Sequence, residues 1–260
     1  MTSLIDPLYT ASGFAVGFLV GMTGVGGGSL MTPLLVVLFG IHPVTAVGTD
    51  LLYAAITKSG GTLVHGFSRN IDWRITARLA LGSVPATAAS LYFLHQMGLE
   101  NPALTRILSL SLGVAVLITA ILLVLRPKLL AFASHRFGEP KSTTSAQLTV
   151  LTGAVLGVLV TLSSIGAGAL GTMVLLVLYP RLSTSRIVGS DIAHAVPLTL
   201  LAGLGHWMLG SVDWDLLRSL ITGSLPGIFL GSMLSSRVPD GLLRGLLATV
   251  LTLVGAKLLF

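Results

Sequence analysis

Long apolar runs separated by short polar stretches follow one another along the whole chain. In the first half, five such runs predict helices over residues 8–20, 30–39, 44–67, 75–98 and 104–125. A helix needs about 20 apolar residues, at about 1.5 Å per residue, to cross a hydrocarbon core of about 30 Å. The last three runs meet that length, whereas the second reaches only about halfway. The pattern therefore predicts membrane-crossing helices and one segment too short to cross alone.

The stretch from Gly21 to Ser29 separates the first two runs and holds five glycines in nine residues. Each glycine inside a helix costs up to about 1 kcal/mol relative to alanine, so a continuous helix is not expected here. Within a bilayer, a broken helix is tolerated only where its backbone is buried in protein or lines a cavity. We therefore expect a glycine-broken helical hairpin whose arms either cross the membrane or re-enter from one side.

The second half of the chain repeats the polar and glycine positions of the first half. Matched residues include Asp, His, Trp, Gly and Pro, which chance similarity between apolar runs would not bring into register. Examples are Gly26 with Gly166, Asp50 with Asp191, His65 with His206, Trp73 with Trp214 and Pro85 with Pro226. We expect two repeats, over residues 1–125 and 147–260, joined by a basic linker over residues 126–146. Each repeat would hold one glycine-broken hairpin followed by three transmembrane helices.

Composition and charge agree with a membrane protein. Of the 260 residues, 53% are hydrophobic and 9% are charged, with a mean hydropathy of +0.94, whereas a soluble domain carries roughly 25% charged residues. The net charge is +6, but Lys and Arg gather at segment ends, which membrane orientation explains better than nucleic-acid binding. The chain has no cysteine, which excludes disulfides and thiolate-bound metals.

The basic residues set an expected orientation, because cytoplasmic loops carry an excess of Lys and Arg. An N-terminus outside the cell places the basic loop at residues 69–78 and the linker at residues 126–146 in the cytoplasm. Each repeat then begins and ends on opposite sides, so the two repeats are inverted relative to each other. This is an architecture of secondary transporters, and the expected fold is an all-α polytopic membrane protein of two inverted repeats.

The two glycine-broken hairpins mark the expected binding site, since paired short, interrupted segments are the best sequence pointer to a transporter site. Their second arms begin near Leu30 and Leu170. A helix N-terminus offers free N–H groups and about half a positive charge to an anion, and Thr32 and Thr172 add hydroxyl donors. The predicted anion-binding residues are Lys58 and the tip residues Thr23, Gly24, Gly26, Gly27, Gly28, Ser29, Ser163, Ser164, Gly166 and Gly168.

Four ionisable residues lie inside the predicted helices, where charge is costly and usually functional. Asp50 and Asp191 occupy equivalent positions, and His194 lies one helical turn from Asp191. The position in the second half that is equivalent to Lys58 holds the uncharged Thr199. Three roles compete. Lys58 pairs with the substrate anion, or Asp50, Asp191 and His194 are proton-coupling groups, or these residues form structural buried pairs. No metal or cofactor is expected, because no metal-ligand spacing accompanies them.

Other paired features have structural interpretations. Glycines at helical spacing are expected to let helices pack closely: Gly13, Gly17, Gly21, Gly153 and Gly157. Two histidines near segment ends are expected to make interfacial hydrogen bonds: His65 and His206. Two Asp-Trp pairs, at 72–73 and 213–214, are interpreted as aromatic anchors at the membrane surface. The Gly-Ser-x-Pro segments at 82–85 and 223–226 predict either a hinge or a static kink.

The glycine motif resembles a known family. The residues Gly17-Phe18-Leu19-Val20-Gly21, Gly24-Val25-Gly26-Gly27-Gly28-Ser29-Leu30, Pro33 and Ala46-Val47-Gly48-Thr49 are similar to the sulfite exporter TauE/SafE family, and Gly153 to Gly157 and Gly166-Ala167-Gly168 fit its twofold layout. The resemblance implies a bacterial-type inner-membrane carrier for sulfite, sulfonates or related small anions. The second copy departs from the motif at Thr161, Ser164 and Ala167, so the two hairpins are not expected to contribute equally.

Together these features predict a secondary transporter of the inner (plasma) membrane. It would export a small, sulfur-containing anion such as sulfite or an organosulfonate, with protons as the candidate coupling ion. Its partners would be the anion, protons and membrane lipid. A passive anion channel is the main alternative, because it would use the same glycine sites without titrating acids. An intramembrane enzyme is a remote alternative and is not expected, since no Ser-His or HExxH arrangement accompanies the two Asp residues.

Overall fold

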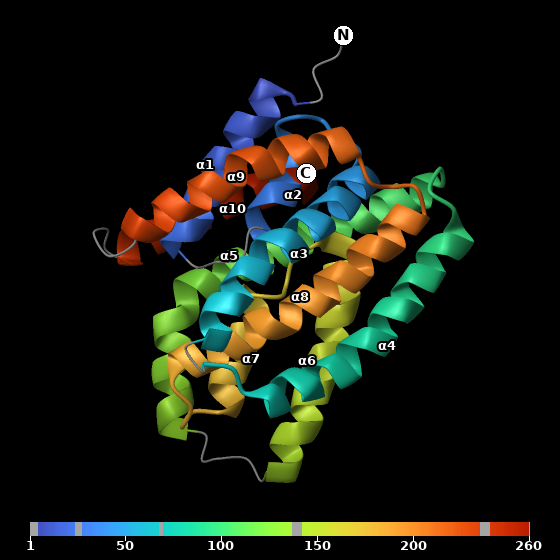
Figure 1. The fold of residues 1–260 in the computed structure, drawn as a ribbon. Coiled ribbons are helices and arrows are strands. Elements are labelled where there is room, and N and C mark those ends of the chain that lie inside the picture. Colours follow the sequence, from blue (N-terminus) through green and yellow to red (C-terminus); the bar gives the residue numbers. More distant parts are fainter. Residues whose placement is uncertain (1–4, 24–27, 68–69, 137–141, 235–239, 260) are drawn as a thin grey trace.

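The protein is a bundle of helices, shown in Figure 1 as a computed structural model. The structure describes residues 5–23, 28–67, 70–136, 142–234 and 240–259. These residues form ten helices and no strand: α1 (Pro7–Thr23), α2 (Gly28–Val37), α3 (Pro43–Phe67), α4 (Trp73–Met97), α5 (Pro102–Arg136), α6 (Ser142–Ser163), α7 (Ala169–Leu178), α8 (Thr184–Met208), α9 (Trp214–Leu234) and α10 (Asp240–Leu259). The prediction of an all-helical chain is confirmed, and each predicted segment of the first half coincides with one helix.

Two helices are much shorter than the rest. α2 and α7 each contain 10 residues, which correspond to about 15 Å, or half of a hydrocarbon core. Each short helix follows a hairpin tip and precedes a helix of 25 residues, α3 or α8. The prediction that the segment after the glycines is too short to cross a membrane is thus confirmed for α2, and α7 shares this length.

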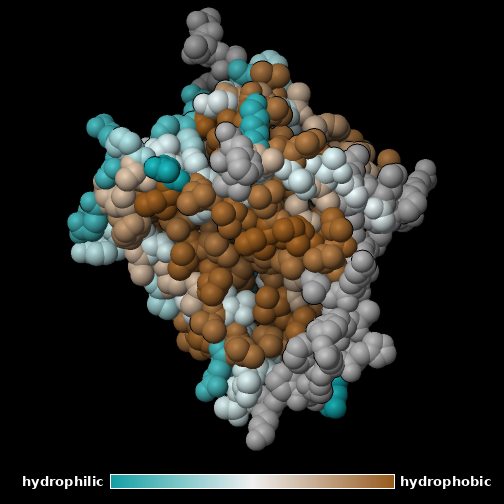
Figure 2. All heavy atoms as spheres, turned by 180° about the vertical axis from the view of Figure 1, so that it is seen from behind, coloured by the Kyte–Doolittle hydropathy of each residue, from teal (hydrophilic) through white to brown (hydrophobic). Residues whose placement is uncertain are grey.

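Long apolar helices make the protein compatible with a bilayer. In the described part of the chain, four helical stretches are long and apolar enough to cross a membrane: Pro102–Leu125, Thr143–Ser163, Thr184–Met208 and Trp214–Leu234. Figure 2 shows a broad apolar area across the middle of one face, with hydrophilic residues gathered mostly toward its margins. Large apolar side chains such as Leu81 and Phe229 are exposed on the surface, as lipid contact requires.

Helix α5 is longer than predicted. The apolar run ends at Leu125, but the helix continues to Arg136, inside the segment predicted to be a linker. Hydropathy marks where a helix leaves the hydrocarbon core, whereas the helix itself can continue through residues with good helix propensity such as Leu, Ala and Arg. The next helix, α6, already begins at Ser142.

Aspartate side chains cap the N-termini of two corresponding helices, α4 and α9. Asp72 accepts hydrogen bonds from the backbone N–H groups of Arg74 and Ile75 at the start of α4. Asp213 does the same at the start of α9. Both are N-caps, which satisfy donors that a helix leaves free. The tryptophans that follow are exposed, at 66% for Trp73 and 42% for Trp214, so the Asp-Trp pairs combine a cap with an aromatic residue that can lie at a membrane surface.

The helices of the two halves pack in reciprocal pairs. α1 lies along α9 and α4 lies along α6, while α3 packs on α8 and α5 packs on α10. In Figure 1 the α3–α8 pair lies between the α1–α9 pair and the α4–α6 pair. The most extensive helix packing therefore joins the two halves and not neighbouring helices of one half. It brings α3 and α8 to the centre.

Glycines allow two of these pairs to approach closely. A Cβ atom on Gly13 would lie 2.3 Å from the carbonyl oxygen of Leu220 on α9, and one on Gly223 would lie 1.8 Å from that of Thr10 on α1. In the α4–α6 pair, a Cβ on Gly153 would lie 2.1 Å from the carbonyl oxygen of Leu79. The prediction that Gly13 and Gly153 serve helix packing is confirmed, since any side chain would force the backbones apart. Gly223, in a segment predicted to be a hinge or a kink, makes the same kind of close contact.

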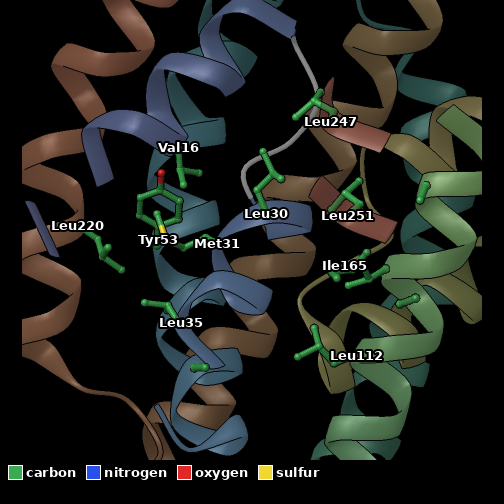
Figure 3. Packing of buried hydrophobic residues seen from close by; sticks show 14 of the residues in the cluster. Val16, Leu30, Met31, Leu35, Tyr53, Leu112, Ile165, Leu220, Leu247 and Leu251 are labelled. Atoms are coloured by element: carbon green, nitrogen blue, oxygen red, sulfur yellow. The ribbon is translucent and has the colours of Figure 1, made fainter. Parts of the chain in front are cut away.

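The short helix α2 is enclosed by apolar side chains. Leu30, Met31 and Leu35 on α2 belong to a buried cluster with residues of α1, α3, α5, α9 and α10. Figure 3 shows these side chains beside Tyr53 of α3 and Ile165 of the second hairpin tip. This packing fixes α2 against α3, which carries two of the predicted functional residues.

Candidate functional site

The second hairpin tip connects α6 to α7 through residues with unusual backbone conformations. Ser164 has a φ of 58°, Gly166 of 132° and Gly168 of 123°. The backbone N–H groups of Gly171 and Thr172 donate to the carbonyl oxygens of Gly166 and Gly168, at 3.2 and 3.3 Å, and so close the first turn of α7 onto the tip. Positive φ is easy for glycine but costs a serine energy, which marks Ser164 as a constrained position.

The first hairpin tip is only partly described. Gly24, Gly26 and Gly27 lie outside the described residues, Thr23 ends α1 and Gly28 begins α2. Ser29 is buried in the first turn of α2. The geometry of the site therefore rests on α2, α3, α7, α8 and the second tip.

Each buried carboxylate contacts the short helix of its own half. Asp50 on α3 accepts a hydrogen bond from the Thr32 hydroxyl on α2, and Asp191 on α8 accepts one from the Thr172 hydroxyl on α7, at 2.9 Å. Backbone N–H groups near the same helix starts, those of Thr32 and Thr172 among them, also face the two carboxylates. The helix N-termini predicted to attract an anion thus face the protein's own carboxylates, an arrangement that the helix dipole favours.

Lys58 links the two halves at this site. Its Nζ donates to the carbonyl oxygen of Ala167 in the second hairpin tip, at 3.0 Å, although Lys58 itself lies on α3 of the first half. The side chain is 9% exposed and interacts electrostatically with both Asp50 and Asp191. One cation and two carboxylates therefore form a buried cluster around the second tip, which we call the Asp-Lys-Asp cluster.

Several polar atoms around the Asp-Lys-Asp cluster have no hydrogen-bond partner among the described residues. They are Oδ1 of Asp50, Oδ1 of Asp191 and Oγ of Ser164, and the Ser164 side chain faces Asp50. A Cβ on Gly171 would lie 2.2 Å from Oδ1 of Asp191, so any residue other than glycine would collide with this oxygen. A buried polar group without a partner costs about 1–3 kcal/mol, so these atoms are the natural contacts for a ligand, a proton or water.

A second pair of polar contacts flanks the cluster. On α8, Nε2 of His194 lies 2.8 Å from the Ser83 hydroxyl of α4. On α3, the Tyr53 hydroxyl lies near Ser224 of α9, without the geometry of a good hydrogen bond. Both contacts join a central helix to the Gly-Ser-x-Pro segment of the other half. Sequence reasoning considered Ser83 only as part of a hinge or kink and did not single out Tyr53, although the offset of 141 residues that matches Asp50 to Asp191 also matches Tyr53 to His194.

The residues before the two carboxylates join the halves reciprocally. The Thr49 hydroxyl accepts a hydrogen bond from the backbone N–H of Asp213, at 3.0 Å, and the Ser190 hydroxyl accepts one from that of Asp72, at 2.8 Å. Each central helix is thus tied to the helix cap of the other half. In the pairs Thr49-Asp50 and Ser190-Asp191, the first residue bonds to the other half of the chain and the second belongs to the Asp-Lys-Asp cluster.

Two further residues that the sequence singled out, Ser163 and His206, are buried and bonded within the protein. Ser163 is buried, and its hydroxyl donates to the Leu159 carbonyl at 2.7 Å, inside α6. His206 is fully buried, with Nδ1 2.9 Å from the Ser211 hydroxyl and Nε2 3.0 Å from the Thr161 carbonyl. The expected hydrogen bonding of His206 is therefore present, and both of its partners are buried in the protein.

Comparison with known proteins decides the family. The model of the family described as "Sulfite exporter TauE/SafE" matches residues 9–258 of the chain. The chain belongs to the sulfite exporter TauE/SafE family. It is 38% identical to the "Probable membrane transporter protein YjnA" of Bacillus subtilis (strain 168), across 95% of this chain and 97% of that protein. No solved structure matches the chain.

Two more distant relatives match over nearly the full length of the chain. The chain is 28% identical to the "Probable membrane transporter protein YdhB" of Bacillus subtilis, across 95% of this chain and 97% of that protein. It is 25% identical to the "Probable membrane transporter protein MJ0441" of Methanocaldococcus jannaschii, across 98% and 96%. Together with the four apolar helices, this makes the chain a multi-pass membrane protein.

Proposed function

We propose that this chain is a secondary transporter that exports a small anion, such as sulfite or an organosulfonate, across the bacterial inner membrane. Membership of the TauE/SafE family supports membrane transport as the activity. The observation that carries the proposal furthest is the position of Lys58, a buried cation that donates to the second hairpin tip and interacts electrostatically with two carboxylates. Intramembrane charges in such positions commonly serve transport.

The architecture proposed for this activity is a pair of inverted repeats. In each half, a helix of 10 residues follows the hairpin tip and a helix of 25 residues comes next. The reciprocal packing of α1 on α9 and α4 on α6 fits a twofold relation between the halves. With the N-terminus outside and the basic segment 126–146 in the cytoplasm, as the positive-inside rule favours, the two hairpins enter from opposite faces.

The proposed substrate site lies between the hairpin tips, beside the Asp-Lys-Asp cluster. Lys58 would supply the positive charge for the anion, and Ser163, Ser164 and the backbone of Gly166 and Gly168 would line the second tip. From the first tip, the proposal includes Thr23, Ser29 and the glycines at 24 and 26–28. Asp50, Asp191 and His194 would bind and release the coupling protons.

Purified protein in liposomes tests this function directly. Vesicles loaded with labelled sulfite, or with labelled methanesulfonate as a small sulfonate, should release the anion faster than protein-free vesicles. A change in the imposed proton gradient should alter that rate. The absence of protein-dependent movement of both anions under every proton gradient would reject this substrate class.

A further inference from the structure

We infer that the Asp-Lys-Asp cluster couples one proton to one monovalent anion, so that neither the empty nor the loaded carrier moves net charge through the membrane. This inference rests on the proposed transport function and adds to it the charge of the substrate and the proton stoichiometry. Because the proton and the anion move in the same direction, export would be driven by the outward gradient of the anion and not by an inward proton gradient. It is carried by the isolation of three fixed charges at the centre of the protein and by the unpartnered carboxylate oxygens beside them.

The cluster is isolated from other fixed charges. Helices α1, α2, α6 and α7 contain no Asp, Glu, Lys or Arg. The charged residues of α4, α9 and α10 lie in the first two turns or the last turn of these helices, as Arg78 and Arg218 do, and those of α5 lie in its first two turns or beyond the apolar stretch that ends at Leu125. The balance of charge in the described centre is therefore set by Asp50, Lys58 and Asp191.

Three titratable side chains near these charges are counted as neutral. His194 on α8 lies in electrostatic contact with Lys58 and is bonded through Nε2 to Ser83. A second buried cation beside Lys58 would be repelled and poorly solvated. Tyr53 on α3 is a phenol near the Asp50 carboxylate, and His206 is bonded to the Thr161 carbonyl and Ser211.

The charge balance then fixes the number of protons. With both carboxyl groups ionised, the cluster carries a net charge of −1, and an uncompensated buried charge is expensive. One proton shared by Asp50 and Asp191 makes the empty cluster neutral. A monovalent anion beside Lys58 adds −1, and a proton on the second carboxylate restores neutrality. The loaded carrier therefore holds one anion and one proton more than the empty carrier.

The geometry offers places for both protons. Oδ2 of each carboxylate already accepts a hydrogen bond from a threonine on its short helix, whereas Oδ1 has no partner among the described residues. A proton on Oδ1 turns each carboxyl group into a hydrogen-bond donor, and Ser164 adds a hydroxyl. An anion at Lys58 would then meet donors in place of two negative charges, so the proton and the anion bind together. A monoanion such as bisulfite or a sulfonate fits this balance, whereas a dianion would leave the loaded carrier with a charge of −1.

Potential dependence in liposomes tests the inference. The probe is methanesulfonate, or labelled sulfite at a pH where bisulfite is abundant if the carrier moves only sulfite. We expect vesicles containing a pH-sensitive dye to acidify by one proton for each anion taken up. A potassium diffusion potential that would accumulate a freely permeant monovalent anion tenfold should leave the flux unchanged. A flux that follows this potential, or that leaves the internal pH unchanged, would overturn the inference while leaving transport intact. A lack of flux for both probes would instead remove the proposed function itself.

A double variant tests the source of the coupling. Replacing both acids, Asp50→Asn with Asp191→Asn, keeps Lys58 but removes both proton sites. This variant should exchange internal for external anion, because its loaded form is neutral, but should lose net uptake and vesicle acidification by at least tenfold. The exposed Asp215→Asn is the matched control and should behave as the parent protein does. Acidification at one proton per anion in the double variant would refute the assignment. If the variant does not fold, the potential measurement on the parent protein still decides the inference.

Discussion

Replacing Gly171 by alanine tests the position of the carboxylate on α8. Gly171 lies in the first turn of α7, and a Cβ there would lie 2.2 Å from Oδ1 and 3.0 Å from Cγ of Asp191. Carbon and oxygen atoms in ordinary contact are about 3.5 Å apart, so the carboxylate would have to move by about 1 Å. The equivalent position in the first repeat carries Met31, so this restriction applies to one half only.

The cost of the substitution follows from the bond that the carboxylate would lose. A shift of this size breaks the 2.9 Å bond from the Thr172 hydroxyl to Asp191. Hydrogen bonds to charged groups are worth about 1.5–3 kcal/mol, and alanine regains up to about 1 kcal/mol through helix propensity. We expect a net loss of stability of about 1–2 kcal/mol. If Asp191 binds a transported proton, the anion flux should fall roughly tenfold or more, since about 1.4 kcal/mol corresponds to a factor of ten.

The assay compares anion flux in liposomes with the thermal unfolding of the same protein in detergent. Gly245→Ala on α10 is the control, because a Cβ there meets nothing within 4 Å. The control should keep both its flux and its unfolding temperature. A Gly171→Ala protein with flux within twofold of the parent, and with the same dependence on pH, would show that the close contact between α7 and Asp191 is not needed for transport.

Three further substitutions probe the cation, the helix packing and a helix cap. Lys58→Met should weaken the equilibrium binding of labelled methanesulfonate at least tenfold, because a charge-assisted bond worth about 1.5–3 kcal/mol is lost. Thr199→Val is its control, and equal binding by both variants would contradict the role of Lys58. Gly223→Leu should lower the unfolding temperature by several degrees, since overpacking costs about 1–3 kcal/mol, whereas Gly241→Leu, with open space around it, should not. Asp213→Ala should cost about 1 kcal/mol in thermal unfolding by removing the cap of α9, and an unchanged unfolding temperature would argue against that cap.

The helices and the burial of the charged residues could be predicted from the sequence. Apolar runs bounded by Pro, Gly and Asp gave helix positions within a few residues for the first half, because both membrane burial and capping leave local marks. The shift of 141 residues between Asp50 and Asp191 predicted that both occupy equivalent places, and both are fully buried on the paired helices α3 and α8. The continuation of α5 beyond Leu125 was missed, because hydropathy does not report where a helix ends.

The partners of the charged residues could not be predicted. Lys58 bonds a backbone carbonyl 109 positions away in the second tip, and a carbonyl leaves no mark in a sequence. The contact of His194 with Ser83 also crosses between the halves. Such contacts depend on how α3 and α8 pack on the other helices, which no local pattern encodes. The bonds from Thr32 to Asp50 and from Thr172 to Asp191 could have been predicted. The two threonines occupy equivalent positions, and both were expected to be hydroxyl donors.

The pairing of α1 with α9 has a consequence for the order in which the protein is made. α1 ends at Thr23 and its packing partner begins at Trp214, so at about 5–20 residues per second a ribosome needs on the order of 10–40 s to supply that partner. Throughout that time the glycines of α1 have no helix to pack against. Of the ten described helices, α1 is synthesised first but is among the last to reach its final contacts. A stalled or truncated chain that lacks α9 would leave α1 in the membrane with its glycine surface open to lipid or to the wrong helix.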